Sequence, residues 1–285
     1  MRKIFVRVLK WRVELSTLCS SIRDMPLADS GAGFSQSLER GLAVLSSFTP
    51  ERPELGISEL ARMLALTRST THRYVATLAA LGYLHQDEDT RRYRLGPRVL
   101  DLGFAVLGSL ELREIAAPHL RRLAETTGHT ANLAVRDDTD AILIDRVRGR
   151  PCRYHHFEFS LHIGSRLPLY CSATGKTLLA FLPHQELDRL LDTIDLTQRG
   201  PRTLTDRTAL LAELEQVRRT GIAVNDEELE NALRSIAAPV RSRSGAVVAA
   251  VNLAIPWSPV AMSELVALLG PAVQGAARQI SARVV

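Results

Sequence analysis

The first third of the chain contains three runs in which apolar residues recur at helical spacing. Within residues 37–48 the apolar side chains fall three or four positions apart, which predicts an amphipathic helix. Residues 58–64 predict a second helix, with Ser58 as its N-cap and the negative charge of Glu59 in its first turn. Residues 68–81 predict a third helix with apolar residues along one side.

Turn-forming residues and two short alternating runs follow the third helix. Thr67 is the expected N-cap of that helix and Gly82 its expected end. Residues 83–86 and 91–95 alternate as short strands do, and the polar stretch between them suits a turn. Three helices followed by a β-hairpin are the layout of a winged helix-turn-helix, which we expect over residues 34–95.

The next stretch, residues 97–110, is apolar around most of a helical circumference. Pro97 suits the first position of a helix, where its missing N–H would have no partner. A helix this apolar needs burial on more than one side. We therefore expect residues 96–110 to link two domains and to pair with the same helix of a second copy.

After residue 110 the apolar pattern switches repeatedly between helical spacing and strand alternation. This mixture predicts an α+β domain with a mainly antiparallel sheet over residues 111–285, its last helix interrupted at Pro271. The expected helices are residues 120–127, 173–182, 205–220 and 263–280, with another starting at Pro183, and the expected strands are residues 130–136, 141–148, 222–225, 235–240 and 246–255.

Composition places the chain among globular proteins and puts its positive charge near the N-terminus. The 285 residues are 46% hydrophobic and 24% charged, which suits two folded domains. The first 110 residues hold 15 Arg and Lys against 11 Asp and Glu, whereas the remainder holds 21 against 20. Such an N-terminal excess suits a phosphate-binding module. Three widely spaced cysteines imply no disulfide framework, so we expect a cytoplasmic protein.

The first 33 residues form an extension that we expect to be flexible. Residues 1–15 alternate basic and apolar positions, without the unbroken apolar core of a signal peptide. No stretch is long and apolar enough for a membrane span, and no membrane partner is expected. Two interpretations remain open: residues 1–24 precede a functional start at Met25, or they form a basic arm that touches DNA or an anionic surface.

The predicted helix over residues 68–81 has one face for a core and one for DNA. Thr71 and Val75 lie on the first face, whereas Ser69, His72 and Arg73 lie on the second, which can enter a major groove. We expect Ser69 and Arg73 to read bases. The alternative is a winged helix that contacts proteins. Residues 68–71 lie at the helix start, where backbone N–H groups favour phosphate, so Thr71 is included there. The candidate DNA-binding residues are Arg68, Ser69, Thr70, Thr71, His72, Arg73, Arg91 and Arg92.

Several segments of the chain closely resemble the IclR family of transcription regulators, over residues 34–285. Within that family the ELENALRSIAAPV segment is most similar to the PcaR/PcaU/PobR group, which regulates aromatic-acid breakdown through the β-ketoadipate route. Ala232 departs from the glycine of many relatives, and a larger residue there is expected to reshape the pocket. The matching segments are SLERGLAVL, ISELAR, STTHRYVATLAALGYL, YRLGPRVLDLG, IGSRLPLYCSATGKTLLAFLP and RSIAAPVRSRSGAVVAAVNLA.

The resemblance implies a winged helix followed by a GAF-like effector-binding domain. It implies a homodimer or tetramer on operator DNA, a small aromatic or dicarboxylic acid as effector, no cofactor, and RNA polymerase as a further partner. The effector would lie between the sheet and the helix after the GSRLP segment, although ordinary strand and cap residues are the alternative. The matching positions are Phe159, Leu167, Ala173, Thr174, Asn225, Leu233, Ser235 and Asn252.

Catalytic and metal-binding patterns find little support in the sequence. The GKT at Gly175 lacks the earlier glycine of a phosphate-binding loop, so Lys176 is expected to be structural or a helix-surface charge. The acids of residues 226–228 are expected to form a solvated turn. An enzyme acting on a small carboxylic acid remains the alternative function. The loose cluster of possible metal ligands has no tight pair and predicts no metal site: Cys152, His155, His156, His162 and Cys171.

Overall fold

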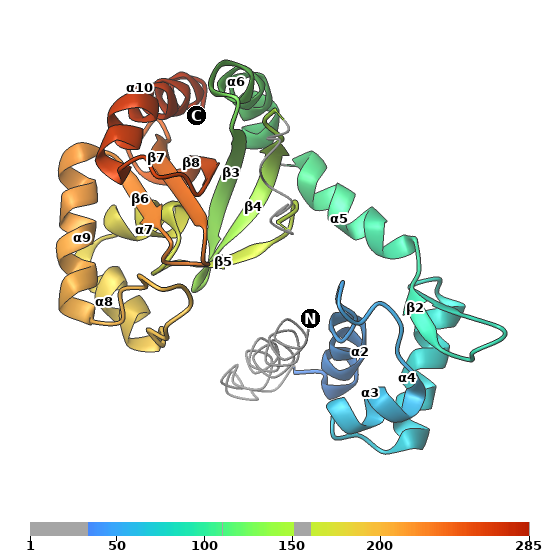
Figure 1. Ribbon diagram of the computed structural model, residues 1–285. Helices are drawn as coiled ribbons and strands as arrows, with labels where there is room; N and C mark the ends of the chain where they lie inside the picture. Colours follow the sequence, from blue (N-terminus) through green and yellow to red (C-terminus); the bar gives the residue numbers. More distant parts are fainter. Residues whose placement is uncertain (1–33, 110, 151–160, 285) are drawn as a thin grey trace, which may run out of the picture. The chain divides into compact units, whose positions relative to one another are not determined.

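The computed structural model describes residues 34–109, 111–150 and 161–284 (Figure 1). These residues form two compact units, one ending at Gly103 and the other beginning at Phe104. The boundary therefore falls inside helix α5 (Arg98–Ser109), which occupies most of the stretch where a linker helix is expected. The extension expected over residues 1–33 lies outside the described residues.

The first unit is the predicted three-helix domain with an antiparallel hairpin. Val44, Leu60 and Val75, one from each helix, are fully buried together. Tyr93 joins the hairpin to this core and exchanges backbone hydrogen bonds with Leu55. The elements are α2 (Gln36–Ser46), α3 (Ile57–Met63), α4 (Arg68–Ala80), β1 (Leu84–Gln86) and β2 (Tyr93–Leu95).

The helix caps confirm one expectation and correct another. Thr67 caps α4, because its Oγ1 accepts a hydrogen bond from the Thr70 N–H at 3.2 Å. The expected cap Ser58 is wrong: α3 begins one residue earlier, and Gly56 is its N-cap. Glu59 explains the difference, since its carboxylate accepts the Gly56 N–H at 2.7 Å and so satisfies the free end of the helix.

The second unit is built on one six-stranded sheet in the order β5-β4-β3-β8-β7-β6. Every neighbouring pair of strands is antiparallel, as the sequence predicts. The strands are β3 (Thr130–Asp137), β4 (Asp140–Val147), β5 (Arg166–Pro168), β6 (Ala223–Asp226), β7 (Leu233–Arg241) and β8 (Val247–Pro256), and the helices are α6 (Glu111–Thr127), α7 (Ala173–Ala180), α8 (His184–Thr193), α9 (Arg207–Thr220) and α10 (Met262–Ser281).

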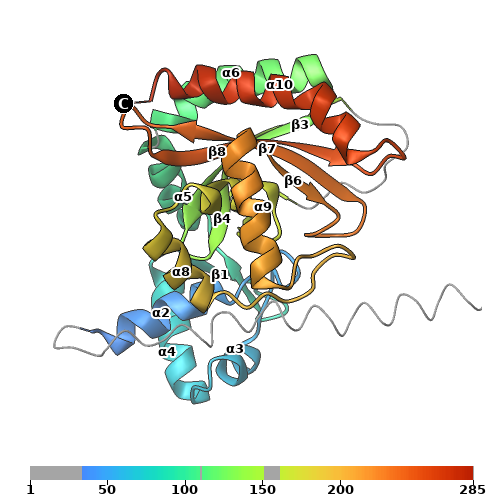
Figure 2. The same ribbon diagram turned by 90° about the vertical axis from the view of Figure 1, so that its left-hand side faces the viewer.

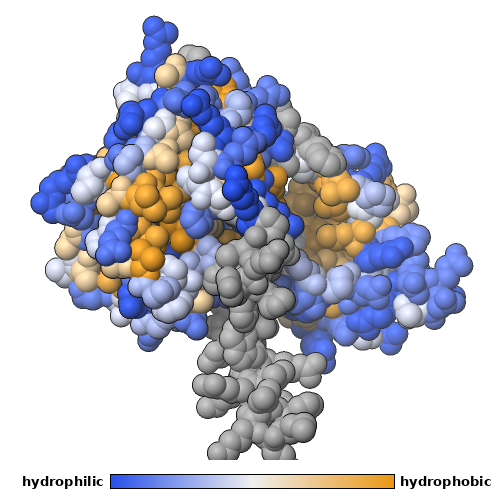
Figure 3. Space-filling model, turned by 45° about the horizontal axis from the view of Figure 1, so that its top comes forward, coloured by the Kyte–Doolittle hydropathy of each residue, from blue (hydrophilic) through white to orange (hydrophobic). Residues whose placement is uncertain are grey.

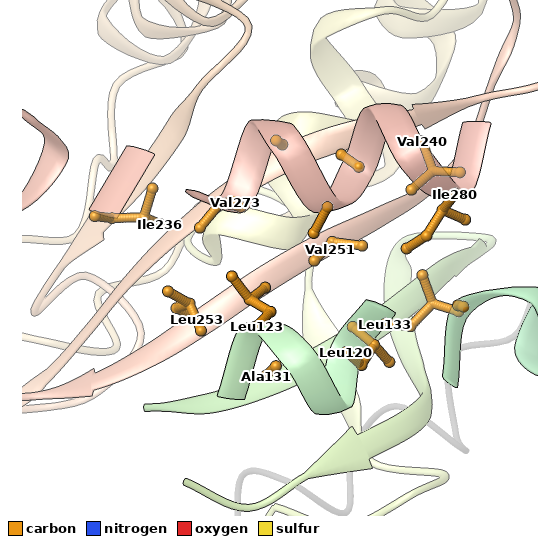
Figure 4. Close-up of a cluster of buried hydrophobic side chains, with 14 of the residues drawn as sticks. Leu120, Leu123, Ala131, Leu133, Ile236, Val240, Val251, Leu253, Val273 and Ile280 are labelled. Atoms are coloured by element: carbon orange, nitrogen blue, oxygen red, sulfur yellow. The ribbon is translucent and has the colours of Figure 1, made fainter. Parts of the chain in front are cut away.

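Helices cover both faces of this sheet. Helices α6 and α10 lie side by side on one face, and α7, α8 and α9 lie on the other (Figures 1 and 2). Figure 4 shows the core under α6 and α10, where Leu120 and Val273 meet Leu133, Val251 and other strand residues. Alternate residues of the central strands enter opposite cores, so most of their side chains are apolar on both faces of the sheet.

Two helices contain prolines in their interiors, contrary to expectation: Pro118 precedes the expected helix of residues 120–127, and Pro271 was expected to interrupt the last helix. Helix α6 begins at Glu111 rather than residue 120 and contains Pro118, and α10 continues past Pro271. The expected interruption at Pro271 is therefore wrong. A proline removes one helical hydrogen bond. Both helices bury long apolar faces against the sheet, and this tertiary packing outweighs the local loss.

On the face shown in Figure 3, hydrophilic side chains surround patches of apolar ones. Leu268 on α10 is the most exposed of the large apolar residues, at 74%. None of the helices in the described ranges combines the length and apolar character that a membrane crossing requires.

Candidate DNA-binding face and effector pocket

Helix α4 offers an exposed polar face and a buried apolar face. Arg68, Ser69, His72 and Arg73 are exposed, and they come from positions that share one side of the helix. Thr71 is a correction, because its side chain is fully buried and its Oγ1 donates to the Thr67 carbonyl at 3.0 Å. Thr71 thus belongs to the core of the unit and cannot offer its side chain to DNA.

Hydroxyl groups gather at the start of α4. The Thr67 Oγ1 donates to the Thr70 Oγ1 at 2.8 Å and lies 3.1 Å from the Ser69 Oγ. Thr70 is half-buried, whereas Ser69 is exposed. The first N–H groups of a helix carry partial positive charge, so this end of α4 favours a phosphate.

The two wing arginines have different surroundings. Arg91 is exposed in the turn of the hairpin and lines a groove with Arg68 and His72 of α4. Arg92 also lines the groove, but its guanidinium donates to the Glu59 carboxylate at 2.8 Å and to the Glu54 carbonyl at 2.9 Å. The Gly56 N–H and then Arg92 hold the pKa of Glu59 below its usual range. Arg92 therefore fastens the wing to α3.

The candidate effector pocket lies on the sheet face that α7 covers. Six of the eight sequence-predicted positions line it, namely all except Ala173 and Phe159. Ala173 is fully buried at the start of α7 but does not border the pocket, and Phe159 lies outside the described residues. The lining residues are Asn132, Leu143, Leu161, Leu167, Ser172, Thr174, Asn225, Leu229, Leu233, Ser235, Asn252 and Ala254.

The pocket is nearly closed in this structure. Its free volume is about 10 Å³, which is room for about one water molecule. Leu161 and Leu229 line it from segments outside the regular strands and helices. A ligand larger than a water molecule therefore needs the lining to move apart, which couples ligand binding to a change of conformation.

Two polar groups of the pocket can donate hydrogen bonds that no described residue accepts. The Asn225 Oδ1 accepts hydrogen bonds from the N–H groups of Glu228 at 2.8 Å and Leu229 at 3.3 Å. Its Nδ2 is buried and has no partner among the described residues, and the same is true of the Thr174 hydroxyl. Buried donors without partners are costly, so this arrangement favours a ligand that brings acceptor oxygens.

Helix α7 is held tightly against the segment that precedes it. Ser172 caps the helix, since its Oγ accepts the Gly175 N–H at 3.1 Å and donates to the Pro168 carbonyl at 2.8 Å. A Cβ on Gly175 would lie 2.3 Å from the Leu169 carbonyl oxygen, so only glycine fits there. The glycine of the GKT segment thus serves close packing.

Lys176 and Glu228 form a buried ion pair, which the local sequence pattern does not predict. The Lys176 side chain is 1% exposed, and its Nζ lies 2.6 Å from Glu228 and 3.2 Å from Glu213. Burial raises the pKa of Glu228, and Lys176 partly opposes that shift. Lys176 is therefore structural, and the expectation that residues 226–228 form a solvated turn is wrong for Glu228.

A hydrogen bond between Asn132 and Asn252 in the pocket wall is a second feature that the sequence did not predict. The Asn132 Nδ2 donates to the Asn252 Oδ1 at 2.9 Å, and both side chains are buried in the pocket wall. Asn132 is the polar residue within the apolar run of residues 131–135, which was the available signal. The pairing itself depends on strand register over 120 residues of sequence and was not readable from local pattern.

Metal-binding and nucleophilic groups are scarce in the described residues. No three His, Cys, Asp or Glu residues cluster there as a metal site would require. Cys171 is buried, and burial raises its pKa to about 12, so its thiol is unreactive at neutral pH. His162 is exposed, and Cys152, His155 and His156 lie outside the described residues.

Two family models match the chain and together span most of it. The model of the IclR helix-turn-helix domain matches residues 37–88. The model described as bacterial transcriptional regulator IclR C-terminal matches residues 104–282. The two matches follow the division between the winged helix and the effector-binding unit.

Curated relatives and solved structures agree with these models. The HTH-type transcriptional regulator XynR of Escherichia coli strain K12 is 35% identical over 81% of this chain and 90% of its own. The Pca regulon regulatory protein of Pseudomonas putida is 37% identical over 87% and 83%. The crystal structure of an IclR homolog complexed with 4-hydroxybenzoate, from Microbacterium hydrocarbonoxydans, matches with 28% identity, a TM-score of 0.74, and coverage of 86% and 98%.

Proposed function

The chain belongs to the IclR family of bacterial transcriptional regulators, and from this premise we propose that it controls genes for aromatic-acid breakdown. It is a ligand-responsive transcription regulator rather than an enzyme. Similarity to the Pca regulon regulatory protein supports the aromatic pathway, as does the 4-hydroxybenzoate bound to a homologous structure. XynR is a differently named regulator of nearly the same identity to this chain, so sequence similarity alone does not select the pathway and a direct test is needed.

The observation that carries the proposal is the lining of the effector pocket. The unpartnered Nδ2 of Asn225 and hydroxyl of Thr174 favour acceptor oxygens, and Leu167 and Leu233 offer an apolar wall. A ring with a carboxylate satisfies both parts. The effector is therefore a small aromatic or dicarboxylic acid, which Ser235 and Asn252 also contact.

Operator recognition is assigned to α4 and the wing. Arg73 and Ser69 read base edges in the major groove, and Arg68 and Arg91 hold phosphates beside it. All four side chains are exposed, and Arg68 and Arg91 share one groove. Thr70 and His72 border the same contact.

A regulator of this kind acts as a homodimer or tetramer on a symmetric operator. Several large apolar side chains of the first unit are exposed in a single chain, and contact with a second copy would cover them. Leu38 and Leu42 lie on α2, and Leu100 and Leu102 lie on α5. RNA polymerase is a further partner in this scheme.

The test is fluorescence anisotropy of the purified chain on the DNA upstream of its own gene, at fixed salt. 4-Hydroxybenzoate, protocatechuate and β-ketoadipate are added separately. We expect tight binding that one of these acids changes severalfold. Tight binding that none of them changes would contradict the aromatic pathway, and binding no tighter than to unrelated DNA would contradict this operator.

A further inference from the structure

A β-bulge in strand β4 turns Arg146 toward the effector pocket. Leu143 lines the pocket, so strict alternation would place Asp145 on the pocket face and Arg146 on the opposite face. The pairing of β3 with β4 shifts register between Leu133 and Ala134, because their partners on β4 are Asp145 and Leu143 and Ile144 is left as an extra residue. Such a bulge re-aims the side chains beyond it.

The contacts on both faces agree with this reversal. Asp145 lies 3.9 Å from Arg113 of α6, which covers the face away from the pocket. Arg146 pairs in register with Asn132, whose side chain lines the pocket. The Arg146 guanidinium donates to the Asn132 Oδ1 at 3.2 Å.

This contact fixes the orientation of two buried amides. A guanidinium has donors only, so Asn132 must turn its oxygen toward Arg146 and its Nδ2 the other way. That Nδ2 donates to the Asn252 Oδ1 at 2.9 Å. Because the Asn252 oxygen points toward Asn132, its Nδ2 lies on the other side of the amide, where it is the group offered to a ligand.

We propose that Arg146 is a positioning residue that determines specificity, because its hydrogen bond to Asn132 makes Asn252 present a donor rather than an acceptor to the effector. The inference rests on the proposed function, since it concerns the same pocket. Asn225 presents its Nδ2 as a donor for a separate reason, because its Oδ1 accepts two backbone N–H groups. Asn252 and Asn225 then both turn N–H donors toward the ligand. A carboxylate accepts from both, whereas the corresponding carboxamide turns its NH2 group toward one of the two donors, so the pocket selects the carboxylate.

The test compares three probes by calorimetry on the full chain: 4-hydroxybenzoate, 4-hydroxybenzamide and the neutral acceptor 4-hydroxyacetophenone. The variants are Arg146→Met, which removes the donor, and Arg146→Lys, which keeps a donor and a charge. Arg136→Met is the matched control, because Arg136 lies on β3 and pairs with the surface residue Glu186. Thermal unfolding confirms that each variant is folded.

We expect the unaltered protein to bind the acid at least about tenfold tighter than the amide, as one mismatched buried hydrogen bond requires. Arg146→Met should reduce this ratio to about threefold or less, and Arg146→Lys should restore it. Arg146→Met should also weaken binding of the neutral ketone, which loss of charge alone would not do. Arg136→Met should leave all three affinities unchanged.

The outcomes separate this inference from the proposed function. Probes that bind and change operator affinity, but with an acid-to-amide ratio that Arg146→Met leaves unaltered, would overturn the role of Arg146 alone. Equal affinity of the unaltered protein for acid and amide would do the same. If no probe binds at millimolar concentration, that result contradicts both the aromatic effector and the role of Arg146.

Discussion

Ala232 holds a backbone conformation that ordinarily belongs to glycine. Its φ is +61°, its carbonyl accepts the Trp257 N–H at 3.0 Å, and its N–H donates to Glu227. The side chain is exposed and does not line the pocket, so the expectation that it reshapes the pocket is wrong. Ala232→Gly should raise the free energy of unfolding by about 0.5–1 kcal/mol, because it relieves the strain of a left-handed residue.

Urea denaturation measures this change, and Ala267→Gly on the exposed side of α10 is its control. A glycine in a helix interior lowers stability by about 1 kcal/mol, so the two substitutions should have opposite signs. A loss of stability in Ala232→Gly would show that the bend before β7 does not strain its alanine.

The buried pair of Lys176 and Glu228 makes a prediction about pH. Lys176→Met leaves the Glu228 carboxylate buried without its cation, which should cost about 3–5 kcal/mol of unfolding free energy near neutral pH. The raised pKa of Glu228 means that the folded state binds its proton more tightly than the unfolded state. Stability therefore falls as pH rises through that pKa, and the fall should be steeper in Lys176→Met.

Urea midpoints measured from pH 5 to pH 8 test this sign. The double variant Lys176→Met with Glu228→Gln removes both charges and should recover part of the loss, most clearly at the higher pH. A loss of equal size at both pH values would mean that Glu228 does not titrate as its burial indicates.

The sequence pattern predicted features that depend on neighbouring residues and missed those that join distant segments. The Thr67 cap and the αL position of Gly82 were predicted because each depends on its immediate neighbours. The pairs of Lys176 with Glu228 and of Asn132 with Asn252 were not, since each joins distant segments. Pattern identified six pocket positions through family resemblance, but it gave no sign that the pocket is nearly closed.

At the scale of elements, the two wing arginines have different expected roles: Arg92 stabilises the wing, and Arg91 is the candidate for DNA contact. Arg91→Ala should weaken operator binding and reduce the slope of log affinity against log salt by about 1, because one phosphate contact is lost. Arg92→Ala should alter that slope much less, since the Arg92 guanidinium is bound to Glu59 and Glu54. Anisotropy titrations at several salt concentrations measure both slopes.

Arg92→Ala should instead lower the stability of the winged helix slightly, by less than about 1 kcal/mol, because its ion pair is partly exposed. Equal reductions of the salt slope in both variants would contradict this division. They would show that Arg92 leaves Glu59 when DNA is bound.

Elements were predicted where the pattern was strong and missed where tertiary packing overrides local rules. The hairpin and the antiparallel sheet were predicted. The first turns of α6 and the continuation of α10 through Pro271 were not, because burial against the sheet sustains helices that proline would weaken in isolation. The bulge in β4 has no local signature, yet it places Arg146 on the pocket face.

At the scale of the whole molecule, two units carry two functions. The winged helix presents exposed Arg68 and Arg73, and the effector unit holds a pocket that must open to admit a ligand. A ligand shifts DNA binding only by its different affinity for the two conformations. Ser235→Leu fills the pocket, and it should abolish the ligand response while basal operator binding remains.

The most direct test of the account is the affinity for 4-hydroxybenzoate measured by calorimetry with and without saturating operator DNA. Coupling between the two sites is reciprocal, so an acid that changes operator binding must itself bind with an altered affinity on DNA. We predict a difference of about 5-fold to 150-fold, which Ser235→Leu removes. Equal affinity in both conditions would contradict the claim that this pocket controls the DNA-binding unit.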